Sequence, residues 1–117
     1  MPEKKIKKNE KREELKELAE ELGVGFLEKA PESVDRKTVK IIPEEVGKKY
    51  GMVSFAREGK NIVKVVMSDP QNVEARNILG FLAERNKVEF DVSIAPPDVI
   101  KEILGKYHSA EKAVEDV

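Results

Sequence analysis

The pattern of apolar and polar residues along the chain predicts short strands that alternate with amphipathic helices. Residues 62–67 are a run of β-branched and apolar side chains that only Lys64 interrupts, which is typical of a strand inside a sheet. Residues 52–57 alternate apolar with small or polar side chains, and a polar connection containing Gly59 follows them. Two such segments joined by a short glycine-containing connection predict an antiparallel β-hairpin.

A further strand is predicted over residues 88–94, where the alternation is the most regular in the chain. Its apolar side chains are expected to face the core, and they are Val88, Phe90, Val92 and Ile94. Glu89, Asp91 and Ser93 are expected to face water, which indicates an open sheet face or an edge. Residues 24–27 are expected to form a shorter extended segment.

Helices are predicted where apolar residues recur at intervals of three and four. The predicted helices cover residues 10–22, 43–50, 70–85 and a segment that begins near residue 98, with a single turn over residues 34–39 capped near Ser33. Their buried stripes include Leu15, Leu18, Ala19 and Leu22 in the first helix, Ala75, Ile78, Leu79 and Leu82 in the third, and Val99, Ile100, Ile103, Leu104 and Tyr107 in the last.

Glycine and proline residues predict where these helices begin and end. Gly23 and Gly51 follow the first two helices and are expected to adopt the left-handed conformation that ends a helix. Asp69 is expected to cap the helix over residues 70–85 with its carboxylate, and Pro70 is expected to take its first position, where no backbone donor is needed. Gly80 lies inside that helix, and we expect it to pack closely against another backbone.

These elements predict an α+β fold with a small sheet of three or four strands that contains the hairpin and has helices packed on it. The length of 117 residues suits one compact domain. We expect that domain over residues 10–108, a flexible basic tail over residues 1–9 and a flexible tail over residues 109–117. Glutamates dilute the lysines of the basic tail, which argues against an arm that binds nucleic acid or a membrane surface.

Composition and charge exclude several classes of function. The 22 basic and 23 acidic residues give a net charge of -1, so no overall bias indicates a nucleic-acid partner. The chain has no cysteine and one histidine, His108, which excludes thiolate and multi-histidine metal sites. No apolar run approaches the roughly 20 residues that a membrane helix needs. We therefore expect a cytoplasmic protein without direct membrane insertion.

Sequence motifs indicate no enzyme. Gly59-Lys60 lacks the upstream glycine of a phosphate-binding loop and is followed by Asn61 rather than by Ser or Thr. Asp69 is the most conspicuous carboxylate, but no partner base accompanies it, so a structural role is preferred over a catalytic one. We expect no catalytic residue, no nucleotide-binding residue, no metal ligand and no cofactor. The residues with predicted structural roles are Asp69, Pro70, Gly23, Gly51 and Gly59.

The order of the elements and the residues at their junctions resemble one protein family. The segments that carry the resemblance are IIPEE at residues 41–45, KY at residues 49–50, VMSDPQNVEA at residues 66–75 and the approach to them at residues 20–27. In order, these segments resemble the N-terminal domain of the ATPases of type II secretion and type IV pilus assembly. The family pattern is a (L/I)-(I/V)-P-E-E helix, a hairpin, an A-M-x-D-P-x-(D/N) turn, and a closing strand and helix.

The chain also departs from that family. Members that bind cyclic di-GMP carry repeated R-L-G-x-x-L-(L/V)-x-x-G segments near the N-terminus, and residues 1–22 contain none. Val66 stands where the family often has alanine, and residues 85–87 replace a usual glycine. The sequence lacks the Walker ATPase domain, so it looks like an excised N-terminal domain or a stand-alone relative.

The resemblance implies a non-catalytic docking domain that links the motor ATPase to the cytoplasmic domain of an inner-membrane secretion or pilus assembly protein. The resemblance is compatible with a parent ATPase that forms a hexamer. The alternative is a cyclic di-GMP-sensing regulatory domain of the same family, and a small enzyme is the least favoured function. Two surfaces are candidates for docking, namely the exposed side of residues 88–94, with Glu89 and Asp91, and the polar face of residues 10–22.

Overall fold

The computed structural model describes the backbone of residues 2–105 and the side chains of residues 12–105. The elements in chain order are α1 (Pro2–Leu22), β1 (Gly25–Phe26), α2 (Arg36–Val39), α3 (Glu44–Tyr50), β2 (Met52–Glu58), β3 (Ile62–Met67), α4 (Val73–Asn86) and β4 (Glu89–Ile94). Residues 97–105 form a further helix, which we call the 97–105 helix. Tyr107, His108 and the predicted tail over residues 109–117 lie outside the described residues.

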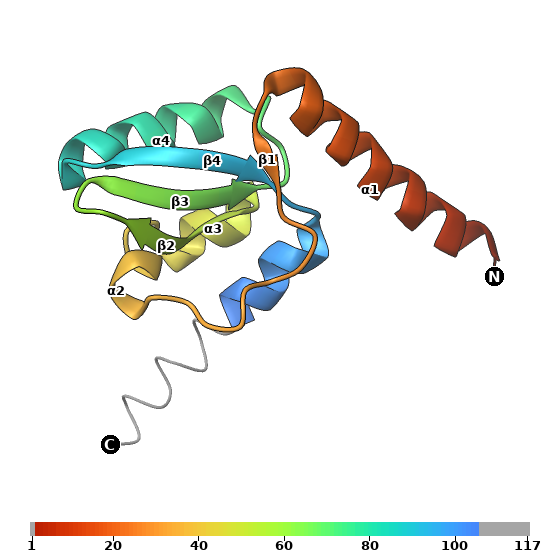
Figure 1. Cartoon of the computed structure of the whole chain (residues 1–117), viewed down its shortest axis with the longest axis horizontal. Helices are drawn as coiled ribbons and strands as arrows, with labels where there is room; N and C mark the ends of the chain where they lie inside the picture. The colour runs from red at the N-terminus through yellow and green to blue at the C-terminus, as the bar shows by residue number, and fades with distance from the viewer. Residues whose placement is uncertain (1, 106–117) are drawn as a thin grey trace, which may run out of the picture.

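The strands form one sheet in the order β1-β4-β3-β2 (Figure 1). β2 and β3 are antiparallel, with Met52 opposite Met67, so the predicted hairpin is confirmed. β4 is parallel to β3, with Val65 opposite Val92, and β1 is parallel to β4. Because parallel neighbours need a crossover connection, α4 carries the chain from β3 to β4. The predicted α+β class with a small sheet is confirmed.

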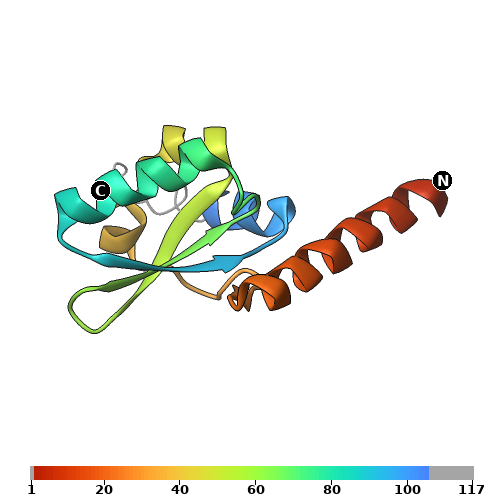
Figure 2. The same ribbon diagram turned by 90° about the horizontal axis from the view of Figure 1, so that it is seen from above.

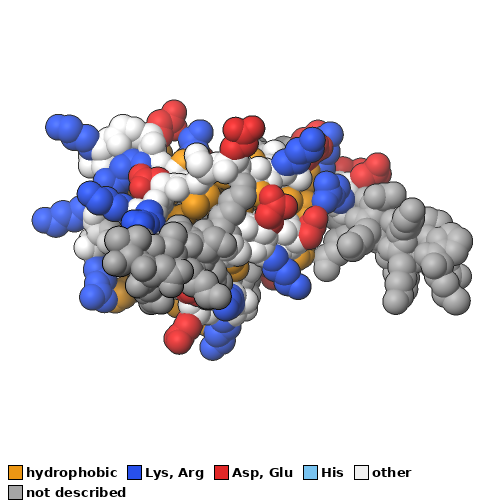
Figure 3. Space-filling model, turned by 90° about the horizontal axis from the view of Figure 1, so that it is seen from below, with side chains coloured by type: hydrophobic (Ala, Val, Ile, Leu, Met, Phe, Trp, Pro, Cys, Tyr) orange, Lys and Arg blue, Asp and Glu red, His pale blue; other side chains and the backbone are white. Residues whose placement is uncertain are grey.

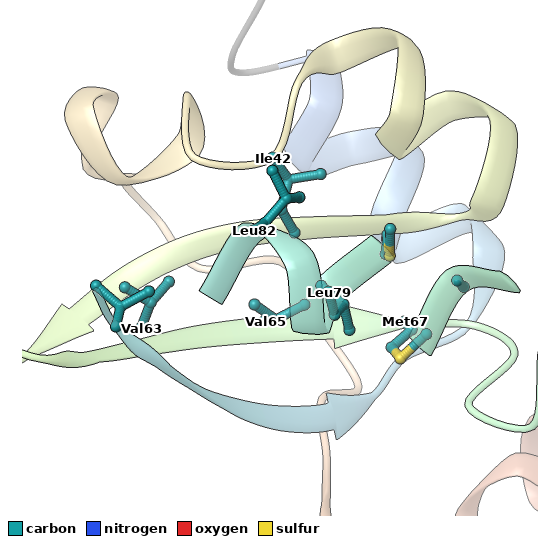
Figure 4. Packing of buried hydrophobic residues seen from close by; sticks show 9 residues of the cluster. Ile42, Val63, Val65, Met67, Leu79 and Leu82 are labelled. Atoms are coloured by element: carbon teal, nitrogen blue, oxygen red, sulfur yellow. The ribbon is translucent and has the colours of Figure 1, made fainter. Parts of the chain in front are cut away.

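One face of the sheet packs against α4 and α3. The alternate residues of β3 that point to this face are fully buried, and they are Val63, Val65 and Met67. Figure 4 shows them beneath Leu79 and Leu82 of α4, with Ile42 packed from the segment before α3. This cluster includes Ala75, so three of the four positions of the predicted α4 stripe are buried here, and Ile78 is half-buried.

The opposite face packs against α2 and the 97–105 helix. Val53 of β2 and Val66 of β3 point to this face and contact apolar residues of both helices. The buried members from the helices are Val39, Val99, Ile100, Ile103 and Leu104. The stripe predicted for the last helix is therefore confirmed for its described residues. Ser54 of β2 is also buried, and its hydroxyl donates to the carbonyl oxygen of Thr38 in α2 at 2.6 Å.

Helix α1 projects away from the sheet and is attached near its C-terminal end (Figures 1 and 2). Ala19 is buried, Leu15 and Leu18 are half-buried, and Leu22 remains 49% exposed. The predicted start at Glu10 is wrong, because the helix begins at Pro2, and the charged residues before Glu10 continue it without a glycine or an internal proline. That residues 1–9 act as a flexible tail stays a prediction.

The start of α4 differs from the prediction. Asn72 is the N-cap, and its side-chain oxygen accepts a hydrogen bond from the amide of Ala75 at 3.1 Å. The Asp69 carboxylate instead accepts from the amide of Gln71 at 3.3 Å, within a turn that Pro70 occupies. The predicted cap at Asp69 and the helical position of Pro70 are therefore wrong. Asn caps a helix about as well as Asp, and Pro favours the second position of a turn, so the turn precedes the helix.

A smaller correction concerns α2. The turn was expected over residues 34–39 with a cap near Ser33, but α2 begins at Arg36 and its cap is Asp35. The Asp35 carboxylate accepts hydrogen bonds from the amide of Lys37 at 3.1 Å and from the hydroxyl of Thr38 at 2.9 Å. Asp35 directly precedes the first residue of α2, and its carboxylate bonds two groups at once.

The glycines at the ends of helices and in the hairpin follow the prediction. Gly23, Gly51 and Gly59 have φ angles of 69°, 65° and 68°, so all three adopt the left-handed conformation. Gly51 is the C-cap of α3. The prediction for Gly80 is wrong, because a Cβ added there would meet no atom within 4 Å. No neighbouring backbone within the described chain requires a glycine at that position.

Candidate functional site

The outer side of β4 is paired with another strand over only part of its described length. Glu89 donates to the carbonyl of Asn61 and Ala95 donates to that of Met67, so the odd-numbered residues of β4 turn their backbone groups toward β3. The backbone amides of Phe90 and Val92 consequently point to the opposite side. There, β1 pairs only with Ser93 and Ile94, at the carboxyl end of β4 (Figure 1). In the part described, no strand pairs with the outer side of residues 89–92, which we call the open edge of β4, although α1 contacts this strand.

A groove of about 590 Å³ runs along this open edge and beneath α4. We call it the β4 groove, and its apolar lining includes Leu22, Val24, Leu79, Ala83, Phe90 and Val92. Phe90 and Val92 are only half-buried, and Leu22 is half exposed. Gly80 also lines the groove, and its missing side chain leaves the groove wider at that point. Strand backbone and apolar side chains are thus accessible at the same place.

The other face of the open edge is acidic. Glu89 and Asp91 are both exposed and point away from α4, because they alternate with Phe90 and Val92 along the strand. On the neighbouring strand, Lys64 lies opposite Asp91 and Ile62 lies opposite Glu89. The face predicted as exposed at residues 88–94 is thus confirmed, and it adjoins the unpaired side of the strand.

A second hollow of about 640 Å³ lies between the end of α3, the turn after β3 and the 97–105 helix. It brings together two residues with predicted structural roles, Gly51 and Asp69. Three lysines line it, but Lys48 pairs with Glu44 at 2.9 Å and Lys49 lies 5.4 Å from the centre of the Tyr50 ring. The pair with Glu44 neutralises Lys48, whereas the contact with the Tyr50 ring leaves the charge of Lys49 in place.

Pro70, Gly23 and Gly59 lie apart from the second hollow. Pro70 lines the β4 groove, and Gly23 lies between two of its lining residues, Leu22 and Val24. Gly59 lies in the hairpin turn and lines neither hollow. The residues chosen from the sequence are therefore distributed over the two hollows and the hairpin turn and do not meet in one chemical site.

Several carboxylates of the described region act in a helix cap or in ion pairs. Among the described residues, no group of three or more His, Cys, Asp or Glu side chains is placed to hold a metal ion. The pKa of the Asp35 carboxyl lies below its ordinary value, chiefly because the Thr38 hydroxyl donates to it. Asp35 acts there as a helix cap. None of the helices within residues 2–105 is long and apolar enough to cross a membrane.

The polar face of α1 carries ion pairs to neighbouring elements. Arg12 contacts Asp98 at 3.0 Å, at the start of the 97–105 helix, and Lys16 lies 3.9 Å from Glu28. All four side chains are largely exposed, so each pair contributes about 1 kcal/mol or less to stability. In the view of Figure 3, acidic and basic side chains are interspersed on the surface of the molecule. The second candidate docking surface is therefore partly engaged within the chain.

The alternation at residues 88–94 predicted an open sheet face or an edge without choosing between them, and the β4 groove was not predicted. The exposed face with Glu89 and Asp91 was predicted, but the order of the strands was not. The signal that was available is the brevity of the extended segment after Gly23, which pairs over only Gly25 and Phe26. So short a strand leaves most of its neighbour unpaired.

The comparisons with known proteins agree with the fold. The family model described as the MshEN domain matches residues 22–114. The type IV pilus assembly ATPase PilB of Myxococcus xanthus (strain DK1622) is 30% identical over 102 residues, which are 86% of this chain. The chain spans only 17% of the length of that ATPase.

Solved structures match at lower identity. A structure of MshE with cdg superimposes with a TM-score of 0.67 and 24% identity, covering 80% of this chain and 65% of that one. The N-terminal domain of XpsE matches with a TM-score of 0.66 and 12% identity, covering 83% of this chain and 66% of that one. These likenesses establish the fold. Because the family model covers most of the sequence, the chain belongs to the MshEN domain family, the N-terminal domains of type II secretion and type IV pilus assembly ATPases.

Proposed function

We propose that this domain is a non-catalytic docking module that links a secretion or pilus motor ATPase to the cytoplasmic domain of an inner-membrane assembly protein. Membership in the MshEN family supports a position at the N-terminal side of such a motor. In this proposal the domain lies in the cytoplasm and reaches the inner membrane through its partner. A hexameric parent ATPase would present several copies of the domain to the membrane platform.

The observation that carries the proposal is the open edge of β4 beside the β4 groove. Monomeric proteins usually cover, shorten or charge the edges of their sheets, because unpaired strands associate with other chains. Here no described strand pairs with the outward amides of Phe90 and Val92, and their side chains are only half-buried. A second protein that contacts this place would gain both backbone hydrogen bonds and apolar burial.

The mixed surface charge supports a protein partner over a polyanion. Basic and acidic residues are almost equal in number, so the domain has no overall field that attracts nucleic acid. Complementary patches of both signs favour selective docking and set the orientation of two proteins. A stable interface of this kind buries about 1,200–2,000 Å² in total, and a transient one buries less.

The test is a titration of the isotope-labelled domain with the cytoplasmic domains of platform proteins from the organism's own secretion and pilus systems. We expect one of them to shift the amide resonances of a contiguous surface at concentrations below hundreds of micromolar. The docking proposal fails if no platform domain changes the spectrum while a metabolite or a nucleic acid does. A pull-down with the same platform domains provides an independent readout.

The second candidate function is a cyclic di-GMP sensor. The observation in its favour is that MshE, which shares the fold, was solved with cdg. Against it, residues 1–22 contain no R-L-G-x-x-L-(L/V)-x-x-G segment. Calorimetry separates the two functions, because docking predicts weak cyclic di-GMP binding and the sensor predicts a low-micromolar affinity. Neither function requires hydrolysis of ATP or GTP by this domain, and we expect none.

A further inference from the structure

We propose that the open edge of β4 receives an extended segment of the partner, in which apolar residues alternate with lysine or arginine. This inference rests on the proposed docking function and specifies the surface and the chemistry of the partner. The added segment would extend the sheet beyond β4, in line with β1. It would occupy the part of the edge that the two residues of β1 leave uncovered.

Backbone geometry determines what the edge can bind. Residues 89–92 present the outward amides of Phe90 and Val92 over a length of about 13 Å at the usual rise of a strand. An extended segment beside them satisfies these amides in the same way as a neighbouring strand does, whereas a helix has its own backbone groups already paired. The occupant is therefore an extended segment.

The β4 groove determines the chemistry of every second side chain of the added segment. Residues placed opposite Phe90 and Val92 point to the same face as those two side chains, because paired residues in a sheet share a face. That face opens into the β4 groove, whose walls include Leu22, Leu79 and Ala83. Alternate residues of the segment are therefore apolar.

Gly80 supports the same conclusion independently. It lies inside α4, where glycine costs about 1 kcal/mol relative to alanine. No atom of the described chain lies within 4 Å of an added Cβ, so packing within the domain does not explain the glycine. Gly80 does line the β4 groove, and its small size leaves space for an apolar side chain that enters from outside.

The acidic face of the open edge determines the charge of the remaining side chains of the added segment. Residues opposite Glu89 and Asp91 lie beside two exposed carboxylates on the face away from α4. Opposite charges on neighbouring strands attract and like charges repel, so lysine or arginine is favoured at these positions. The complete pattern is an apolar residue followed by a basic one, repeated over four or five positions.

The probe is a capped peptide of about seven residues in which lysine and valine alternate, a length typical of a strand. A matched peptide in which glutamate replaces each lysine tests the charge preference. We expect the basic peptide to shift the amide resonances of Phe90 and Val92 and to slow their hydrogen exchange. We expect the acidic peptide to leave both unchanged. Equal binding of the two peptides, or shifts confined to another surface, would overturn the inference.

Two variants of Gly80 separate docking from folding. Gly80→Leu places a long side chain in the β4 groove and should weaken binding of the basic peptide by about tenfold, the factor that corresponds to about 1.4 kcal/mol. Gly80→Ala makes the same change of helix propensity without filling the groove and should bind as the wild type does. Both substitutions favour the helix, so unfolding would not produce the loss. Unchanged binding by Gly80→Leu contradicts the inference.

Charge reversal tests the acidic face. The double variant Glu89→Lys, Asp91→Lys should bind the glutamate–valine peptide and lose the lysine–valine peptide. If it binds both peptides as the wild type does, the acidic face has no role and the inference is wrong.

The same variants distinguish this inference from the proposed function. If a platform domain binds the wild type and Gly80→Leu equally well, docking stands and the open edge is not its site. If no platform domain binds while the basic peptide still occupies the open edge, the inference stands and the proposed partner is wrong.

Discussion

The two edges of the sheet differ in how well they are protected from other chains. At β2, the strand contains a bulge between Ser54 and Ala56, and the carbonyl of Phe55 accepts a hydrogen bond from the amide of Asp35. Helix α2 packs on the same strand. At β4, Ser93 and Ile94 are the described residues that have an outer strand partner, and α1 also contacts the strand. Bulges and covering segments prevent association at an edge, so one edge of this domain is closed and the other remains available.

The difference indicates how a small domain separates stability from recognition. The β2 side carries buried polar contacts, such as the hydroxyl of Ser54 on the carbonyl of Thr38, which fix one arrangement of strand and helix. The β4 side carries half-buried apolar residues and an exposed glycine in α4. Substitutions on the β2 side should therefore affect folding, and substitutions on the β4 side should affect binding.

The largest expected effect comes from a matched pair of valines in the same layer of the sheet. Val65 is fully buried in the central strand, and its register partner Val92 is half-buried at the open edge. We expect Val65→Ala to lower the free energy of unfolding by about 2–3 kcal/mol and Val92→Ala to lower it by about 1 kcal/mol or less, because the first leaves a cavity. Urea denaturation measures both. Equal losses would mean that the open edge is as well packed as the interior.

The second prediction uses two glycines in helices that pack on the same face of the sheet, Gly47 in α3, which contacts β2, and Gly80 in α4, which contacts β4. A Cβ added at Gly47 in α3 would lie 2.6 Å from the carbonyl oxygen of Met52, whereas one added at Gly80 would meet nothing within 4 Å. We expect Gly47→Ala to destabilise the domain by about 1–2 kcal/mol, because the clash with backbone exceeds the gain in helix propensity. Gly80→Ala should stabilise it by about 0.5–1 kcal/mol. Thermal unfolding of the two variants gives opposite shifts if the closed and open sides differ as described.

The third prediction concerns the start of α4, which forms one wall of the β4 groove. Asn72→Ala removes the side-chain acceptor of the Ala75 amide and should cost about 1 kcal/mol. Asp69→Ala removes only the contact to the Gln71 amide within the turn and should cost less. Chemical denaturation of the two variants ranks them, and a larger loss for Asp69→Ala would restore Asp69 as the dominant cap.

The smallest expected effect is a pH dependence at the closed edge. The Thr38 hydroxyl holds the pKa of the Asp35 carboxyl below its ordinary value, so the contribution of Asp35 to stability is present above the unfolded pKa, about 3.9. It is lost as the pH falls through the lower folded pKa. Thr38→Val removes the donor, and an NMR titration of the carboxyl should then give a higher pKa than in the wild type. Identical titration curves would exclude the hydroxyl as the cause.

Local patterns in the sequence predict most of the strands and helices. They predict less accurately the residues at which a helix begins. The β-branched run around Val65 and the alternation around Val92 each determine a strand, because the pleat places successive side chains on opposite faces. The start of α4 was misplaced because Asp69 and Asn72 have nearly equal capping preference, and the proline between them suits a turn as well as a helix. Local chemistry alone does not choose between two such caps.

The candidate site was less predictable than the fold because it depends on contacts between distant segments. The exposed side of Glu89 and Asp91 follows from alternation, but the open edge depends on where β1 pairs, some 68 positions away along the chain between Gly25 and Ser93. Gly80 was assigned to internal packing for the same reason, since a sequence does not show which side of a helix faces empty space. Strand order and groove geometry are properties of the folded chain.

A small rotation of α1 where it meets the sheet moves its N-terminal end over a larger distance. At 21 residues it is about 30 Å long, and its described attachments include the burial of Ala19 near one end and the exposed ion pairs from Arg12 to Asp98 and from Lys16 to Glu28. A rotation of about 10° at the buried end moves the other end by about 5 Å, by the geometry of a rod of that length. An added strand that displaces the end of α1 beside Leu22 would therefore move the N-terminal end of the helix over a longer distance. Salt weakens the exposed ion pairs and would increase the range of this rotation.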